Sequence, residues 1–115
     1  MEIQSMATVV PVENLAEAVS ALSALLYTEP TFVDGDRWAQ FDFNGHRIAL
    51  AGTDRTSDKA GVMLKVDDLE AAGLAIQTAG LKAGDVEEGP HEQRITVEGP
   101  GGWPIVLYAP DPNKS

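Results

Sequence analysis

Cysteine is absent from this chain of 115 residues. Its absence excludes disulfides, zinc ribbons, thiol nucleophiles and iron–sulfur ligation together. Long apolar runs are absent as well: the longest, residues 21–27 and 105–109, fall far short of the ~20 residues that a membrane-spanning helix needs. The first residues carry neither a basic region nor an apolar stretch, so we expect no signal peptide. These absences favour a cytoplasmic protein.

Basic residues are scarce. Lys and Arg number 8 against 18 Asp and Glu, which gives a formal net charge of −10. Such a surface repels nucleic-acid phosphates and anionic membranes, and no basic stripe interrupts it. We therefore expect neither nucleic acid nor a membrane as a partner. The acidity favours solubility, with attraction of a cationic small molecule as the alternative. The length and a hydrophobic content of 43% fit a single globular domain.

A strand followed by a helix begins each half of the chain. Residues 4–12 are rich in Val, Thr and Met, which predicts a buried strand, and Asn14 then caps a helix with apolar residues at helical spacing. In the second half, residues 61–66 predict a strand. Asp67-Asp68 caps the helix that follows, and Gly80 stands where a left-handed cap would end it.

Alternating strands follow each helix. Residues 37–43 and 46–51 alternate in polarity around Asn44-Gly45, which is a strong hairpin signal. Residues 94–98 and 103–109 alternate in the same way around a glycine-rich turn. The order of elements in the first half is therefore repeated in the second.

Two short motifs indicate that the halves are copies of one unit. Val12-Glu13-Asn14-Leu15 recurs as Val66-Asp67-Asp68-Leu69, and Ile48-Ala49-Leu50 recurs as Ile105-Val106-Leu107 at a similar offset. We expect one domain, residues 1–115, with a first module at about 4–52, a linker at about 53–60 and a second module at about 61–110.

The sequence resembles the vicinal oxygen chelate superfamily, which includes glyoxalase, bleomycin resistance protein and extradiol dioxygenase. The resemblance rests on residues 66–72 with Ala79-Gly80, and on the run Gly99-Pro100-Gly101-Gly102-Trp103-Pro104-Ile105-Val106-Leu107-Tyr108-Ala109-Pro110. It implies an α+β fold of two βαβββ modules whose curled sheet forms a cup with the helices outside. Many proteins of this group pair as homodimers, so the resemblance also implies a homodimer.

The strand period of two sorts the side chains into two faces. One face is almost wholly apolar and is expected to pack under the helices: Thr8, Val10, Val12, Ala39, Phe41, Phe43, Ile48, Leu50, Val62, Leu64, Val66, Ile95, Val97, Ile105 and Leu107. The other face is mixed in polarity and is expected to line the cup. We predict that ligand-binding residues come from this face and its rim: Ala7, Val9, Trp38, Gln40, Asp42, Arg47, Ala49, Gly61, Met63, Arg94, Glu98, Trp103, Val106 and Tyr108.

The resemblance also predicts where a metal would sit. Metal-using members of the family place His, Glu or Gln at the start of the first strand of each module and Glu in each closing strand. The matching positions here are Ala7, Ala49, Gly61 and Val106, and none of these side chains carries an oxygen or nitrogen donor. We therefore expect no metal and no other cofactor.

Other polar residues leave alternatives open. His46 and His91 are predicted to be solvated, with a metal pair or catalytic dyad as the alternative. Asp42 and Glu98 lie at a solvated rim or form an acid–base pair. The basic residues Arg47, Lys65 and Arg94 either neutralise those carboxylates or hold an anionic ligand.

Aromatic residues make up only 6% of the chain, so their placement is informative. Trp38 and Tyr108 alternate away from the apolar face, where they would stack on a flat ligand or fill a dimer interface or the floor of the cup. The resemblance implies a metal-independent small-molecule-binding protein that sequesters a toxic or antibiotic compound. The alternatives are a lyase, isomerase or dioxygenase that uses a relocated metal site or Asp/Glu acid–base catalysis, and a vestigial interaction subunit.

Overall fold

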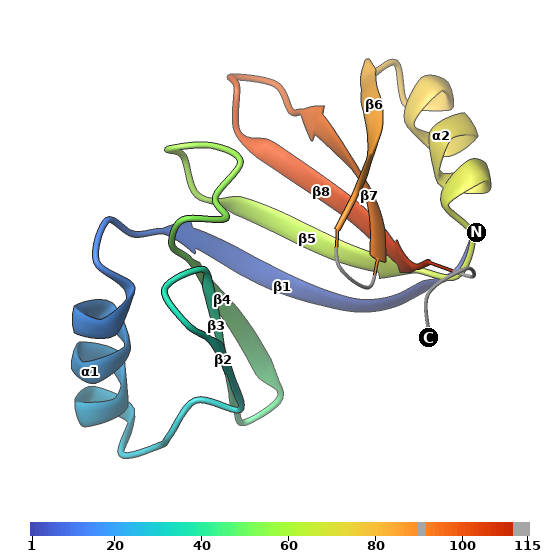
Figure 1. Ribbon diagram of the computed structural model, residues 1–115. Coiled ribbons are helices and arrows are strands. Elements are labelled where there is room, and N and C mark those ends of the chain that lie inside the picture. Colours follow the sequence, from blue (N-terminus) through green and yellow to red (C-terminus); the bar gives the residue numbers. More distant parts are fainter. Residues whose placement is uncertain (90–91, 112–115) are drawn as a thin grey trace. The chain divides into compact units, whose positions relative to one another are not determined.

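The part of the chain that the structure describes contains two helices and eight strands (Figure 1). They follow one another in the order β1-α1-β2-β3-β4-β5-α2-β6-β7-β8. The structure is a computed structural model, and it describes residues 1–89 and 92–111. The chain divides into two compact units. Residues Ala7–Ala60 are called module one below, and Met1–Met6 together with the described residues from Gly61 onward are called module two.

Module one contains a strand, a helix and three further strands, joined in the sheet order β2-β3-β4-β1. Its strand β1 pairs with β4 in parallel, whereas β3 pairs with β2 and β4 antiparallel. This connectivity is one βαβββ unit. Its elements are β1 (Ile3–Pro11, of which residues 7–11 belong to this module), α1 (Leu15–Leu26), β2 (Phe32–Asp34), β3 (Trp38–Phe43) and β4 (His46–Ala51).

Local chemistry sets the ends of these elements. The side chain of Asn14 accepts a hydrogen bond from the backbone N–H of Glu17 at 3.0 Å, which confirms the predicted cap of α1. The helix ends at Tyr27, a left-handed residue with φ of 53°. Asn44 and Gly45 have φ of 49° and 82°, the pair of positive angles that a tight two-residue hairpin needs, and so the predicted turn is confirmed.

Module two repeats this organisation with the sheet order β5-β8-β7-β6. Strands β5 and β8 pair in parallel, and β7 pairs antiparallel with β8 and β6, with a register shift in β6 between Ala83 and Val86. Asp68 caps α2 through the backbone N–H of Ala71 at 3.2 Å. The elements are β5 (Gly61–Val66), α2 (Leu69–Thr78), β6 (Ala83–Glu88), β7 (Glu92–Glu98) and β8 (Pro104–Pro110).

The first residues of the chain are tied to the start of α2. The backbone N–H of Glu2 donates to Oδ1 of Asp67 at 2.7 Å, and the N–H of Asp67 donates to the carbonyl of Glu2 at 3.2 Å. The donated N–H of Glu2 holds the pKa of the Asp67 carboxyl below its ordinary value. Strand β1 thus begins in module two and ends in module one.

Each module has its own apolar core between its helix and one face of its strands. In module one the buried residues are Leu15, Ala39, Phe41 and Leu50, with Val10, Val12 and Ile48 packed against them. In module two they include Val66, Ala72, Ile76, Ile95, Val97 and Leu107, with Leu64 and Ile105 packed alongside. The predicted core face is confirmed for these strand residues. The predicted burial was wrong for Thr8, which is exposed although it is in register with Ile48, and for Phe43, which is 40% exposed at the end of β3 beside the hairpin turn.

The expected α+β fold of two βαβββ modules is confirmed. Strands β2 and β6 were not located from the sequence, because Phe32–Asp34 has only three residues and Ala83–Glu88 combines a glycine with three carboxylates. Within the described residues, neither helix is both long and apolar enough to cross a membrane.

Candidate functional site

The strand face of module one that turns away from α1 carries polar side chains on β3 and β4, close to their hairpin turn. The register places Asp42 opposite Arg47, and it places Ala49 between Val9 on β1 and Gln40 on β3. Because Ala39 and Phe41 lie in the core beneath α1, their neighbours Gln40 and Asp42 face the other way. Sequence alternation therefore predicted this face correctly.

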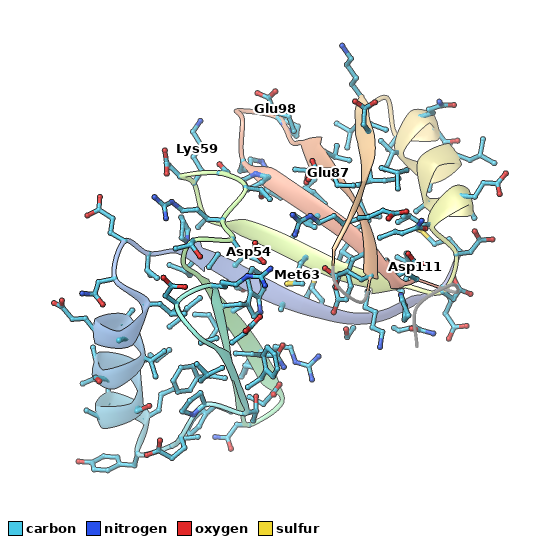
Figure 2. The ribbon with its side chains drawn as sticks, in the orientation of Figure 1. Asp54, Lys59, Met63, Glu87, Glu98 and Asp111 are labelled. Carbon is cyan, nitrogen blue, oxygen red and sulfur yellow. The ribbon has the colours of Figure 1, made fainter. Side chains whose placement is uncertain are left out.

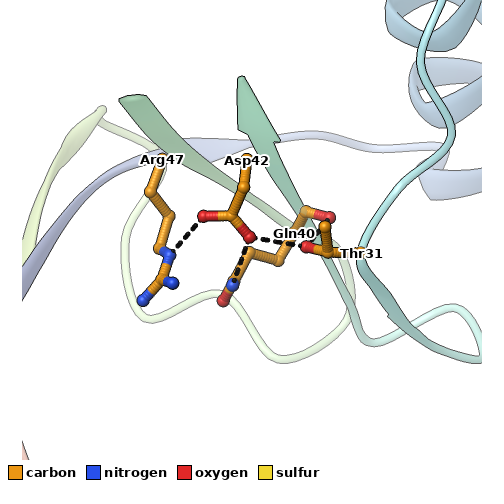
Figure 3. A network of polar contacts seen from close by, with 4 residues as sticks. All are labelled: Thr31, Gln40, Asp42 and Arg47. Carbon is orange, nitrogen blue, oxygen red and sulfur yellow. Dashed lines mark hydrogen bonds and ion pairs between the residues drawn. The ribbon is translucent and has the colours of Figure 1, made fainter. Parts of the chain in front are cut away.

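Asp42 is the centre of a hydrogen-bonded network on this face (Figure 3). Its Oδ1 accepts from Nε of Arg47 at 2.7 Å, and its Oδ2 accepts from Oγ1 of Thr31 at 2.8 Å and Nε2 of Gln40 at 3.3 Å. The hydrogen bond from Arg47, followed by the one from Thr31, holds the pKa of Asp42 below its ordinary value. Thr31 was missed in the sequence because it lies outside any periodic segment, just before β2.

This network limits what Asp42 can do chemically. A general base works best when its pKa lies near the working pH, and the pKa of Asp42 is shifted in the opposite direction. Three of its acceptor positions are also occupied by side chains of its own module. Asp42 is therefore suited to fixing Arg47, Gln40 and Thr31 in place.

Replacing Asp42 with asparagine is expected to lower the free energy of unfolding near neutral pH by about 1 kcal/mol or less, because ion pairs this exposed are screened by solvent. Both partners, Asp42 and Arg47, keep 37% of their side-chain exposure. The pKa of Asp42 is lowered from 3.8, so the stabilisation is complete above that value and is lost as the pH falls through the lower pKa of the folded state. Urea denaturation of both proteins at several pH values measures the difference, which should shrink in acid.

Asp58→Asn is the matched control for this prediction. Asp58 also pairs with an arginine, Arg55, at 3.4 Å, but its side chain is 95% exposed. The control should change the unfolding free energy very little at any pH. A constant difference between the wild-type protein and Asp42→Asn from neutral to strongly acidic pH would contradict the prediction.

The four positions where the family resemblance places metal ligands hold side chains that do not fit a metal. Ala7 and Ala49 are 5% and 0% exposed, so they are small and buried. At Gly61 a Cβ atom would overlap the carbonyl oxygen of Pro104, so even alanine meets the neighbouring strand there. Val106 lies between Met63 and Thr96 in the register. Among the residues described, no three His, Cys, Asp or Glu side chains form a group that could hold a metal ion.

The strand face of module two that turns away from α2 holds a row of polar side chains. The register places Lys65 beside Tyr108, Tyr108 beside Arg94 and Arg94 beside Glu87, on four neighbouring strands. Nη2 of Arg94 lies 3.6 Å from Oε2 of Glu87. Figure 2 labels Met63 and Glu87, which come from β5 and β6, the first and last strands in the module-two order β5-β8-β7-β6.

Two polar atoms on this face are buried without a hydrogen-bond partner among the described residues. They are Nε of Arg94 and Oγ1 of Thr96, which lie two residues apart on β7 and therefore on the same side of the sheet. An unpaired buried donor costs about 1–3 kcal/mol, so such atoms call for an explanation. Sequence reasoning placed Arg94 on this face but did not single out Thr96 as a site residue.

The remaining predicted site residues lie at the margins. Glu98 is exposed at the end of β7, and the ring of Trp103, which is also exposed, lies against Gly99 in the turn before β8. Trp38 is partly exposed, and in the register it pairs with Ala51, at the end of β3 and β4 that is far from their hairpin turn. His46 is exposed beside its hairpin turn, and His91 lies outside the described residues.

A shallow hollow also opens in the linker. Its volume is about 490 Å³, and none of the predicted ligand residues lines it. The lining residues are Thr53, Arg55, Thr56, Ser57 and Asp58. Arg55 is already engaged there by Asp58 and by the carbonyl of Gly52.

The chain has the fold of the vicinal oxygen chelate superfamily, as the resemblance implied. Solved structures with this likeness include a glyoxalase/bleomycin resistance protein/dioxygenase superfamily member from Vibrio splendidus 12B01. Its TM-score is 0.68 at 12% identity, over 91% of this chain and 97% of that chain. No model of a protein family matches the chain, and no curated protein matches it.

Two further structures show the range of proteins with this fold. NAD-dependent benzaldehyde dehydrogenase from Legionella pneumophila has a TM-score of 0.80 at 13% identity, over 93% of this chain and all (100%) of that chain. A variant of Streptomyces coelicolor methylmalonyl-CoA epimerase, in complex with 2-nitronate-propionyl-CoA, has a TM-score of 0.73 at 12% identity, over 99% of both chains. At these identities the likeness establishes the fold, and the function has to be argued from the site.

Proposed function

We propose that this protein binds a small molecule without a metal ion, through the strand faces that turn away from the helices. The observation that supports this most directly is the chemistry of those faces. Polar and aromatic side chains such as Arg94 and Tyr108 occupy them, whereas Ala7, Ala49, Gly61 and Val106 offer no donor atom for a metal. A few placed polar groups on an otherwise apolar surface are typical of ligand sites.

The proposed biological role is sequestration of a toxic or antibiotic compound by a cytoplasmic homodimer. The expectation of a dimer and of this role follows the family resemblance. The epimerase neighbour in complex with 2-nitronate-propionyl-CoA supports the broader part of the proposal, because a chain of the same fold there holds a small ligand.

Acid–base catalysis is the second candidate, and the geometry of module one favours it less. Asp42 would have to accept a proton, but its pKa is lowered by Arg47 and Thr31, and Gln40 also donates to it. A relocated metal site would need three suitable ligands close together. Within residues 1–89 and 92–111 no such group is present.

Ligand titration after dialysis against a chelator tests the proposed function. The protein labelled with nitrogen-15 would be titrated with planar aromatic compounds that are neutral, cationic or anionic, and amide shifts would be followed by NMR. We expect at least one compound to bind more tightly than ~1 mM, with shifts on the strand faces named above. Binding that appears only after zinc, nickel, iron or manganese is restored, or no binding at all, would contradict the proposal.

A further inference from the structure

We infer that the strand face of module two recognises an anionic group, a carboxylate or a phosphate, held between Lys65 and Arg94 over Tyr108. These three residues are called the basic row below. The inference rests on the proposed function and narrows it, since it assigns the binding of the charged part of the ligand to one module and one chemistry. It also replaces the cationic ligand that the overall charge of the protein would favour.

The register places the two cations of the basic row on the two strands that flank Tyr108. Lys65 on β5 and Arg94 on β7 are each the direct partner of Tyr108 on β8, the strand between them. Neighbouring strands are about 4.8 Å apart, so the two backbones lie about 10 Å apart with the tyrosine in the middle. Long side chains that converge from both sides of such a gap can reach the oxygens of one carboxylate or phosphate.

The two buried, unpartnered atoms strengthen this assignment. Nε of Arg94 and Oγ1 of Thr96 lie on the same face of β7, and both can donate a hydrogen bond. The side chain of Arg94 keeps 23% of its exposure, so part of it is open to solvent although Nε itself is buried. The oxygen atoms of an anion are acceptors of the kind that Nε of Arg94 and Oγ1 of Thr96 lack among the described residues.

The carboxylates nearby leave the basic row available to a ligand. Glu87 lies 3.6 Å from Arg94, beyond hydrogen-bonding distance, and its own side chain is 56% exposed. An incoming anion can therefore replace it. On β7, Glu98 is exposed at the strand end, and the carboxylate of Glu92 lies close to Gly89.

Module one provides a contrast on its equivalent face. There Arg47 gives its Nε to Asp42 at 2.7 Å, and two further donors complete the same carboxylate. In module one, therefore, the carboxylate that neutralises Arg47 is supplied by Asp42 of the protein itself and not by a ligand. Among the described residues of module two, the carboxylate that pairs with Arg94 is that of Glu87 at 3.6 Å, and Nε of Arg94 has no hydrogen-bond partner, which is why we assign the anion to this module.

A matched series of ring compounds tests the inference on the full-length protein. Benzoate, phenyl phosphate, benzamide and benzylamine share the aromatic ring and differ in the group that it carries. We expect NMR shifts at Lys65, Thr96, Arg94 and Tyr108 with benzoate or phenyl phosphate, and binding at least about tenfold weaker for benzamide and benzylamine. The ratio of benzoate to phenyl phosphate affinity shows whether a carboxylate or a phosphate is preferred.

Charge-removing variants decide whether the basic row is responsible. Arg94→Gln and Lys65→Gln should each weaken anion binding about tenfold, and Glu87→Gln should tighten it. Lys82→Gln is the control, because it removes the same charge from an exposed residue outside the strands. The amide spectrum of each variant verifies its fold, and Lys65→Gln serves if Arg94→Gln does not fold.

The outcomes separate this inference from the proposed function. Benzamide binding as tightly as benzoate on the same face, or an equal loss in Lys82→Gln, would overturn the inference and leave small-molecule binding standing. The absence of shifts with all four compounds would overturn the inference, whereas the proposed function would be contradicted only if the wider panel of planar compounds also failed to bind.

Discussion

Gly61→Ala is expected to lower the free energy of unfolding by about 1–3 kcal/mol, although it adds only one methyl group. The new Cβ atom would overlap the backbone carbonyl of Pro104 on the paired strand β8, so two strands would have to separate. The carbonyl of Pro104 belongs to the backbone, so it cannot turn out of the way as the end of a flexible side chain can. Equilibrium urea denaturation followed by circular dichroism measures the change.

Gly73→Ala provides the matched control within the same module. Gly73 lies inside α2 and an added Cβ meets nothing within 4 Å, so this variant should be more stable by about 0.5–1 kcal/mol. Opposite signs for the two substitutions are the expected result. A neutral or stabilising Gly61→Ala would show that β5 and β8 have room for a side chain there, and the argument against a metal ligand at this position would lose its steric part.

Phe41→Ala is expected to have the largest effect on stability, a loss of about 3–5 kcal/mol. Phe41 is 0% exposed and is the largest fully buried side chain in module one. Its removal leaves a cavity between α1 and the sheet, directly behind Asp42 on the same strand. Urea denaturation followed by circular dichroism, and by the fluorescence of the two tryptophans Trp38 and Trp103, measures the loss.

Phe43→Ala is the control for this effect on the same strand. Its ring is 40% exposed, so truncation removes little buried area and should cost only about 1 kcal/mol. Equal losses for the two variants would mean that the core of module one extends to the hairpin turn. That result would restore the core position that alternation had assigned to Phe43.

Features with strong local chemistry could be predicted from the sequence. The caps at Asn14 and Asp68 depend on one side chain and one backbone N–H three residues later, so they are readable without the fold. The hairpin at Asn44-Gly45 is readable for the same reason, since few residues adopt two successive positive φ angles. The faces of β3, β7 and β8 followed from alternation because their buried residues lie mainly on one side of each strand, and β4 followed as the hairpin partner of β3.

Features that depend on long-range packing could not be predicted. Strands β2 and β6 lie at the ends of the strand order, and almost all of their residues are exposed. No alternation of apolar and polar residues therefore marks them in the sequence. Thr31 joins the Asp42 network from a segment without any period. For the candidate site, the sequence indicated Arg94, but only the register shows that Lys65 and Arg94 share Tyr108 as a neighbour.

The acidic composition of β6 bears on self-association. This strand is the outermost of module two, it carries Asp85, Glu87 and Glu88, and its pairing is interrupted near Ala83. If the β6 strands of two molecules paired with each other, their carboxylates would come close together and repel. This repulsion disfavours the growth of a continuous intermolecular sheet. Substitutions that neutralise Asp85, Glu87 and Glu88 would remove this repulsion and leave the edge of β6 open to pairing with a second strand.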